Sequence, residues 1–248
     1  WIHLEIDRES DAPDREEIVT RLRAVLSDVR EAVEDWSKMR ERAREVAENL
    51  RANPPAAVPA AEVTQAADLL EWLADNHFTF LGYREYDLGE VPAGTGLVPV
   101  PGTGLGLLRP DPPMNADRPA LTGAVLAKAR EPRALFVTKA NSRSTDHRPA
   151  HLDYVGVKVI DAQGQVCGER RFLGLFTASA YAESVVRVPF LREKVQAVMA
   201  GAGFAPDSHS GKDLLGVLED YPRDELFQAD VDQLIDVTSA VLSIADKR

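Results

Sequence analysis

The sequence has 248 residues, of which 44% are hydrophobic, and this is enough to bury one or two cores. Its 29 basic and 40 acidic residues give a formal net charge of −11, which argues against nucleic acid and anionic membranes as partners. Cys167 is the only cysteine, so an internal disulfide and a zinc site of several cysteines are both excluded. No apolar run approaches the ~18 residues of a membrane span, and we expect a cytoplasmic protein. The first residue is Trp1 rather than Met, so we expect a piece of a longer polypeptide.

The first 60 residues begin with a strand pattern and continue with a helical one. Apolar and polar residues alternate over residues 1–7, which predicts a short strand. Residues 8–60 predict one long helix or two in succession, because apolar residues recur every three or four positions. A stripe this long indicates a strut that packs against another domain, although an ordinary amphipathic helix on its own domain gives the same pattern. The stripe comprises Ile18, Leu22, Val25, Val29, Val33, Trp36, Met39, Ala43, Val46 and Leu50.

The middle of the chain, residues 61–182, mixes helical and strand patterns. The expected segments in chain order are a helix at 62–75, strands at 77–88 and 104–109, a helix at 115–130, and three strands between residues 134 and 177. In the first strand, simple alternation puts Phe78, Phe80 and Tyr86 on one face and Leu81 and Tyr83 on the other.

The last strands of this region have two different patterns. Val155, Val157 and Val159 alternate with polar residues or glycine, as in a strand with one buried face. Residues 172–176 are apolar or glycine on both faces, which predicts a central strand with Phe172 and Phe176 buried. The order of segments predicts an α+β fold with a PAS-like five-stranded antiparallel sheet, in which the first and last strands are central. Residues 183–248 return to helical spacing and predict a C-terminal helical segment.

One loop concentrates hydrogen-bond donors in this acidic chain. Lys139, Asn141, Arg143, His147 and Arg148 lie on it, and Arg171 of the last strand is a further candidate for the same region. These groups could bind a carboxylate or phosphate, or an acidic patch of a neighbouring domain. A polar loop whose side chains bond only to its own backbone gives the same sequence pattern. His147 and His151 have a metal-like spacing, but a loop does not force both imidazoles to one side, and we expect no metal.

No catalytic motif is complete. The glycines at 102, 104 and 106 lack the spacing of a dinucleotide-binding loop, and no serine lies in a G-x-S-x-G elbow. No combination of acid, base and nucleophile can be named, so an enzyme in its own right is the least favoured interpretation.

Several long blocks of the chain resemble one protein family. HFTFLGYREYDL, PGTGLG, TKANSRSTDHRP, LDYVGVKV, GERRFLGLFT, SHSGKDLL and YPRDELFQ are similar, in this order, to the N-terminal half of the large bacterial NAD-specific glutamate dehydrogenases. The resemblance implies ACT-like domains and a PAS-like domain joined by helices, with the Rossmann catalytic core far downstream. Residues 1–7 would then be the last strand of an ACT-like domain. No motif of the catalytic core is present, so no catalytic residue is carried over, and Lys139 is not matched to the catalytic lysine.

The resemblance implies a non-catalytic regulatory and scaffolding segment. The full-length enzyme would oxidise L-glutamate to 2-oxoglutarate and ammonia with NAD, while this segment would hold no cofactor. Its expected partners are other domains of the same chain, the other subunits of a homo-oligomer and a small-molecule effector. The alternative is a free-standing PAS-type sensor or interaction module that binds a small ligand between its sheet and helices.

Overall fold

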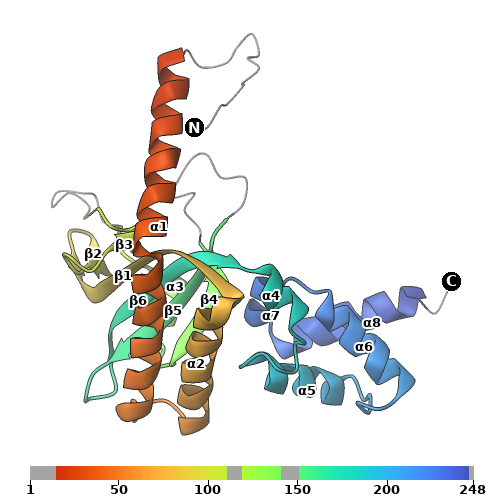
Figure 1. Cartoon of the computed structure of the whole chain (residues 1–248). Coiled ribbons are helices and arrows are strands. Elements are labelled where there is room, and N and C mark those ends of the chain that lie inside the picture. Colours follow the sequence, from red (N-terminus) through yellow and green to blue (C-terminus); the bar gives the residue numbers. More distant parts are fainter. Residues whose placement is uncertain (1–14, 111–118, 141–150, 246–248) are drawn as a thin grey trace.

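The computed structural model describes residues 15–110, 119–140 and 151–245 (Figure 1). The first helix, α1 (Arg15–Ala52), is continuous, because no Pro or Gly interrupts it. It ends where the chain enters Pro54 and Pro55, which cannot extend a helix. The long apolar stripe therefore lies on one helix rather than on two.

The two halves of α1 differ in what they contact. The C-terminal half packs against α2 (Ala60–Trp72) and the sheet, while the N-terminal half projects beyond the body of the molecule (Figure 1). Residues of the packed half belong to the same hydrophobic core as the sheet, namely Met39, Ala43, Val46, Ala47 and Leu50. In the projecting half, Leu26 and Val33 are exposed.

A six-stranded antiparallel sheet forms the centre of the fold. Its strands are β1 (Phe78–Val91), β2 (Gly94–Pro99), β3 (Leu105–Gly106), β4 (Leu135–Lys139), β5 (Asp153–Ile160) and β6 (Val166–Phe176). The order is β2-β1-β6-β5-β4, and β3 pairs with β1 outside this path. The first and last long strands, β1 and β6, therefore pair with each other in the interior of the sheet, as the sequence predicts.

Two expected segments differ from the structure. The second strand is Gly94–Pro99, which forms a hairpin with β1, whereas the expected strand at 104–109 is reduced to the two residues of β3. Gly94, at φ 138°, begins the returning strand of a tight hairpin. The helix expected at 115–130 begins only at Gly123, as α3 (Gly123–Arg130), and residues 119–122 are not helical.

A β-bulge changes the faces of β1. The pairing of β1 with β6 shifts register between Phe80 and Gly82, so Leu81 is an extra residue. Phe80 and Tyr83 consequently lie on the same face, where both rings contact Phe172. The expectation that Phe80 and Tyr83 lie on opposite faces is therefore wrong, because simple alternation holds only up to a bulge.

One face of the sheet carries the aromatic core. Phe78 packs edge-on against both Phe80 and Phe176, and Phe172 is completely buried. The helices α1 and α2 pack on this side, and their buried residues join the same core. The predicted burial of Phe172 and Phe176 is confirmed.

After the sheet the chain continues as a group of short helices beside it (Figure 1). These are α4 (Ala178–Ala182), α5 (Leu191–Gly201), α6 (His209–Glu219), α7 (Arg223–Gln228) and α8 (Val231–Ala245). Their inward residues include Val195, Leu214, Leu226 and Leu234, which are fully buried or nearly so. The α+β class and the C-terminal helical segment agree with the sequence analysis.

Candidate functional site at the joint between the sheet and the C-terminal helices

Buried charged groups gather where the sheet meets the C-terminal helices. We call this region the joint, and define it by Lys139, Asp153, Lys194, Arg223 and Asp224 with their partners. Arg223, Asp153 and Asp224 are at most 4% exposed. Since a buried charge is costly unless it is paired, these groups constrain how the sheet and the helices meet.

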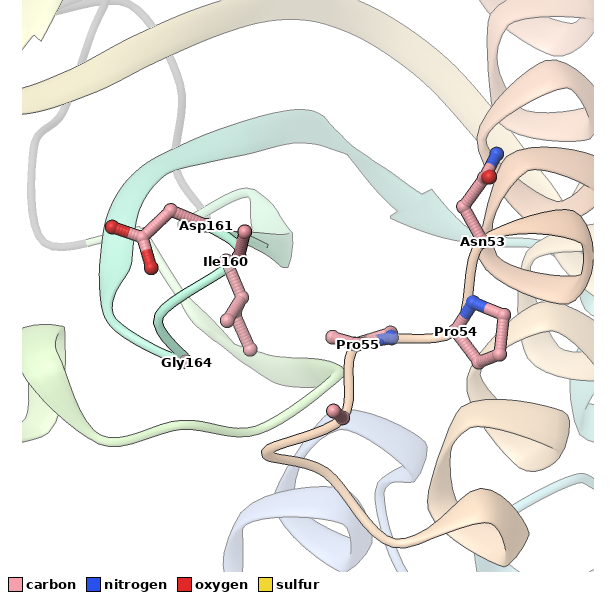
Figure 2. Close-up of a pocket in the computed structure, with 8 residues that line it drawn as sticks. Asn53, Pro54, Pro55, Ile160, Asp161 and Gly164 are labelled. Carbon is pink, nitrogen blue, oxygen red and sulfur yellow. The ribbon is translucent and has the colours of Figure 1, made fainter.

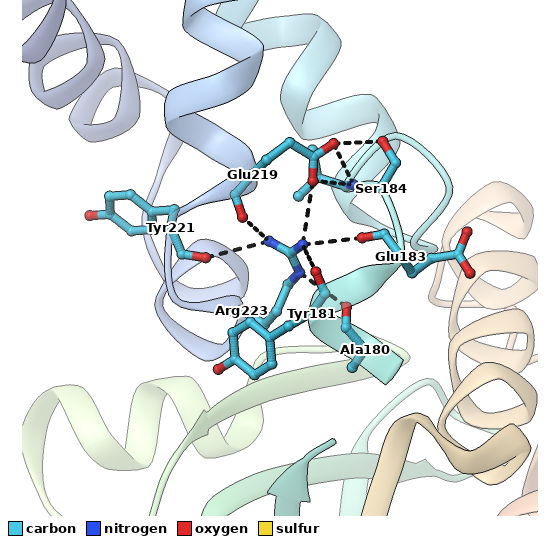
Figure 3. Close-up of polar contacts among 8 residues, drawn as sticks. Ala180, Tyr181, Glu183, Ser184, Glu219, Tyr221 and Arg223 are labelled. Carbon is cyan, nitrogen blue, oxygen red and sulfur yellow. Dashed lines mark hydrogen bonds and ion pairs between the residues drawn. The ribbon is translucent and has the colours of Figure 1, made fainter. Parts of the chain in front are cut away.

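Arg223 is the centre of the joint and is 0% exposed. Figure 3 shows its guanidinium enclosed by the end of α4 and the end of α6. The guanidinium donates to the carbonyl oxygens of Ala180 (3.3 Å), Tyr181 (3.3 Å), Glu183 (3.1 Å), Glu219 (3.0 Å) and Tyr221 (3.4 Å). It also pairs with the Glu219 carboxylate at 3.4 Å. One side chain thus satisfies carbonyls at two helix ends, where no intrahelical donor is available.

Glu219 extends this network toward α5. Its carboxylate accepts hydrogen bonds from the Ser184 hydroxyl at 2.6 Å and from the backbone N–H of Val185 (Figure 3). The local sequence explains the geometry: α6 ends at Glu219, and Pro222 immediately precedes α7, so the turn between them directs Arg223 back to α4. The joint therefore depends on the sequence Tyr-Pro-Arg-Asp at the start of α7.

Lys139 bridges the sheet to α7. Its ammonium lies 3.2 Å from the Asp153 carboxylate and 3.1 Å from that of Asp224. The other oxygen of Asp153 accepts the backbone N–H of Phe176. Although partial burial opposes it, the hydrogen bond to Asp224 and the charge of Asp153 raise the pKa of Lys139. Burial raises the pKa of Asp153, despite the ammonium beside it.

Lys194 of α5 caps the other end of α7. Its ammonium donates to the carbonyl oxygens of Leu226 (2.9 Å), Phe227 (2.8 Å) and Ala229 (2.8 Å). A cation at this place compensates the negative end of the helix dipole. Burial nevertheless lowers the pKa of Lys194 to about 8.

Two weaker contacts complete the joint. The Thr138 hydroxyl donates to the side-chain carbonyl of Gln228 at 3.1 Å, and the Phe227 ring stacks on Phe176 with centroids 5.8 Å apart. The short helix α7 is therefore held by the edge strand β4, by the central strand β6 and by α5.

Arg171 lies elsewhere. Strand pairing and alternation place it on the opposite face of the sheet from Lys139, so the structure does not bring these two predicted residues together. Its guanidinium lies between the rings of Tyr86 (4.4 Å) and Tyr154 (4.5 Å) and pairs with Glu169 at 3.2 Å. This is a cation–π sandwich, which fixes the side chain against the sheet.

Lys158 and Glu169 are buried next to Arg171. Their charged groups are 3.5 Å apart, and the Lys158 ammonium also donates to the carbonyl oxygen of Ala129 in α3. Burial raises the pKa of Glu169 and lowers that of Lys158 to about 8. Each cation thus already has partners within the described residues, as expected of a structural cluster.

The other candidates of the donor-rich loop, Asn141, Arg143, His147 and Arg148, lie outside the described residues. Their role as a docking or anion-binding loop stays a prediction. The imidazole Nδ1 of His151 lies 3.0 Å from the carbonyl oxygen of Ala140.

Sequence reasoning missed Asp153, Lys194, Arg223 and Asp224. The sequence around Arg223 and Asp224 gives little signal, because Pro222 and Glu225 flank them at a helix start, where charged residues are usually exposed. The identity of their partners depends on segments some forty residues away along the chain.

A surface cavity of about 370 Å³ lies between the turn after α1 and the β5–β6 hairpin (Figure 2). Pro54 and Pro55 line one side, and Ile160, Asp161 and Gly164 line the other (Figure 2). One oxygen of Asp161 already accepts two backbone N–H groups of its own turn. Asp161 and Asn53 are the polar side chains among the residues that line the cavity.

The space between the sheet and α2 is filled by side chains. Four rings form a continuous series of contacts, in the order Phe176, Phe78, Phe80 and Phe172, and the indole of Trp72 in α2 contacts Phe176. A ligand at the position expected for a PAS-type sensor would have to displace these rings.

Among the described residues, none of the helices combines the length and the apolar character that crossing a membrane requires.

Comparisons with known proteins agree on one family. Residues 188–247, which include α5 to α8, match the family described as glutamate dehydrogenase, helical motif 1. The chain is 42% identical over its whole length to an NAD-specific glutamate dehydrogenase of Halomonas elongata. It is 40% identical over 99% of its length to one of Pseudomonas aeruginosa, and 28% identical over its whole length to one of Mycobacterium tuberculosis.

The chain spans about 15% of the length of these curated relatives. The match covers the helical joint as well as the sheet, since it extends over essentially every residue. The chain is therefore related, from end to end, to one segment of the NAD-specific glutamate dehydrogenases.

Proposed function

We propose that this chain is a non-catalytic regulatory and scaffolding segment of an NAD-specific glutamate dehydrogenase. The observation that carries the proposal is how the cationic groups of the joint are used, of which Arg223 is buried and Lys139 and Lys194 are partly buried. Arg223, Lys139 and Lys194 all bind carbonyls or carboxylates of the chain itself, and within the described residues none of them lines the surface cavity. Such groups hold elements in a fixed orientation, which is what a scaffold requires.

The parent protein would catalyse the NAD-dependent oxidation of L-glutamate to 2-oxoglutarate and ammonia, with the cofactor bound by other parts of the polypeptide. The names of the relatives support this assignment. A cytoplasmic location and assembly with other domains and subunits fit such an enzyme.

We also infer that residues 61–182 form a PAS-like domain. The strand order β2-β1-β6-β5-β4 supports this, because it places the first and last long strands at the centre of an antiparallel sheet. The aromatic filling of the core favours a PAS-like module that transmits contacts over one that binds a ligand between sheet and helices. No specific observation favours the free-standing sensor.

In this proposal the function of the joint is to hold the PAS-like sheet and the C-terminal helices in one orientation. Movement of one part is transmitted to the other as long as α7 stays fixed by Arg223 and Lys194. Loss of these contacts should uncouple the parts without removing any catalytic group.

The test compares the purified chain with the full-length enzyme in the same assay. We expect the chain alone to show no glutamate-dependent reduction of NAD, while the full-length enzyme reduces it. In the full-length enzyme, Arg223→Met should change effector response or assembly, and Arg187→Met, an exposed arginine, serves as the matched control. Turnover by the isolated chain would contradict the proposal. An Arg223→Met enzyme that assembles and responds like the wild type would assign the joint to local stability alone.

A further inference from the structure

The projecting half of α1 exposes a row of apolar side chains. Leu26 is 50% exposed, Val29 53% and Val33 71%. These residues lie on the half of the helix that extends away from the sheet and α2 (Figure 1). Contiguous apolar surface of this kind indicates an interaction site.

The exposed row continues an interface that is already buried. Apolar residues recur along α1 at alternating intervals of four and three, which is a heptad pattern. The series is Ile18, Leu22, Val25, Val29, Ala32, Trp36, Met39, Ala43, Val46 and Leu50. From Met39 onward its members are buried against the rest of the chain. We call the members before Ala32 the seam: Val29 is exposed, and Ile18, Leu22 and Val25 are only partly buried. Within the described residues the seam therefore has the pattern of a helix–helix contact without the second helix.

The positions beside the seam select the partner and its direction. In heptad notation Leu22 and Val29 are a positions, and Val25 is a d position. On one side of the exposed seam, the e positions are apolar: Val19, Leu26 and Val33. On the other side, the g positions Arg21 and Asp28 carry opposite charges.

A parallel pair of these helices would be unfavourable. It sets each g position against an e position of the second helix, so Arg21 would face Leu26 and Asp28 would face Val33. Asp28 would then be desolvated against Val33 without a counter-charge from the second helix, and Arg21, which pairs with Glu17 of its own helix, would be desolvated against Leu26.

An antiparallel pair resolves both mismatches, because it sets g against g and e against e. When Leu22 packs against Val25 of a second copy, Arg21 lies opposite Asp28 of that copy on one side. On the other side, Val19 lies opposite Leu26. In this register residue 15 faces residue 32, so the overlap ends where Ala32 of α1 becomes buried in its own chain.

We propose that residues 15–32 of α1 pair antiparallel with the same residues of a second copy of this chain. The overlap is roughly 27 Å long at the rise of an α-helix. In this arrangement the two sheet domains lie at opposite ends of the shared pair. The proposal does not depend on the assignment to glutamate dehydrogenase and stands or fails separately from it.

Sedimentation equilibrium of the purified chain over a range of concentrations tests the pairing. We expect a monomer–dimer equilibrium for the wild type. Val29→Asp should weaken it at least about 100-fold, because a charge enters the seam twice per dimer. Val125→Asp on α3, where the valine is 60% exposed, is the matched control and should leave the equilibrium unchanged. Circular dichroism confirms that both variants keep their helices.

Charge exchange tests the direction and the identity of the partner. Arg21→Asp and Asp28→Arg should each weaken self-association about tenfold or more, since each variant sets like charges opposite each other. The two variants mixed together should associate at wild-type strength. In the mixed pair, the new carboxylate at position 21 of one chain meets the new guanidinium at position 28 of the other, and the two unchanged residues also meet as opposite charges. The double variant should also associate with itself.

Three results would overturn the proposal. The wild type could remain monomeric at all concentrations, which would assign the seam to a different protein or to another segment of a longer chain. The charge variants could associate as well as the wild type. The mixture could fail to restore association while the single variants weaken it, which would exclude the antiparallel register.

Discussion

The aromatic face of the sheet and the joint are both buried, yet they are stabilised in different ways. The aromatic face consists of rings that fill space, with Phe172 and Phe80 at its centre. The joint consists of charges that satisfy carbonyls and carboxylates, with Arg223 at its centre. Packed rings tolerate substitution by residues of similar volume, whereas a buried guanidinium tolerates almost none, because its acceptors are left unpaired.

The two regions also differ in whether their contacts fix the relative orientation of the packed elements. Apolar contacts are non-directional, so the aromatic face can hold the sheet to α2 without specifying a fine angle. Hydrogen bonds are directional, so the contacts of Arg223 and Lys194 specify how α7 sits against its neighbours. This chain assigns the two properties to different regions.

The largest effect should come from the aromatic face. Phe172→Ala should lower the free energy of unfolding by roughly 3–5 kcal/mol, and Phe176→Ala by a similar amount, because each leaves a cavity among the rings. Leu175→Ala, at a position 39% exposed, is the control and should cost about 1 kcal/mol or less. Urea denaturation measures all three. A loss near 1 kcal/mol for Phe172→Ala would show that the rings are loosely packed.

The joint should show the next largest effect. Arg223→Met should lower the free energy of unfolding by about 3 kcal/mol, because carbonyls at two helix ends and the Glu219 carboxylate lose their donor. Arg187→Met removes an arginine whose side chain is 78% exposed and should cost less than about 1 kcal/mol. In denaturation followed by two probes, we expect the helices to unfold before the sheet in the Arg223 variant. If the helices and the sheet still unfold together in the Arg223→Met variant, the contacts of Arg223 are not what couples the two parts.

The two regions should also differ in their response to pH. Burial lowers the pKa of Lys194 to about 8, below its value in the unfolded chain, so the unfolded state binds more protons between about pH 8 and 10.5. Stability should therefore rise with pH in this window, by at most about 1.4 kcal/mol per pH unit from this group.

Comparison of variants assigns the pH effect. Lys194→Met in the joint and Lys158→Met on the other face of the sheet should each reduce the slope, since the pKa of Lys158 is also lowered to about 8. Phe172→Ala should shift the whole curve without changing its slope. Denaturation between about pH 7.5 and 9.5 provides the measurement, and an unchanged slope in both lysine variants would contradict the assignment.

The smallest effect on the chain itself should come from the donor-rich loop. Charge reversal at Arg143 and Arg148 should change the free energy of unfolding by less than about 1 kcal/mol, because loop charges rarely contribute more. In the full-length enzyme the same changes should weaken assembly or alter effector response. The test measures thermal denaturation of the chain and, for the full-length enzyme, its oligomeric state and activity. Unfolding of the chain would make the loop structural, and no change in either preparation would make it merely solvated.

Local sequence patterns determined much of this fold. The period of two in β5 and the doubly apolar pattern of residues 172–176 predicted a central β6, and its pairing with β1 confirms it. The apolar stripe predicted one long helix or two in succession, and the structure has one, α1. These features are readable because side-chain direction repeats with a fixed period along a regular element.

Only the tertiary structure decided the rest. The bulge after Phe80 moved Tyr83 to the aromatic face, since one extra residue reverses every later side chain. Lys139 and Arg171 separated onto opposite faces, and Arg223 acquired its acceptors from α4 and α6. The partner of a side chain across the fold depends on how distant segments pack, and the local periodicity of the sequence does not predict it.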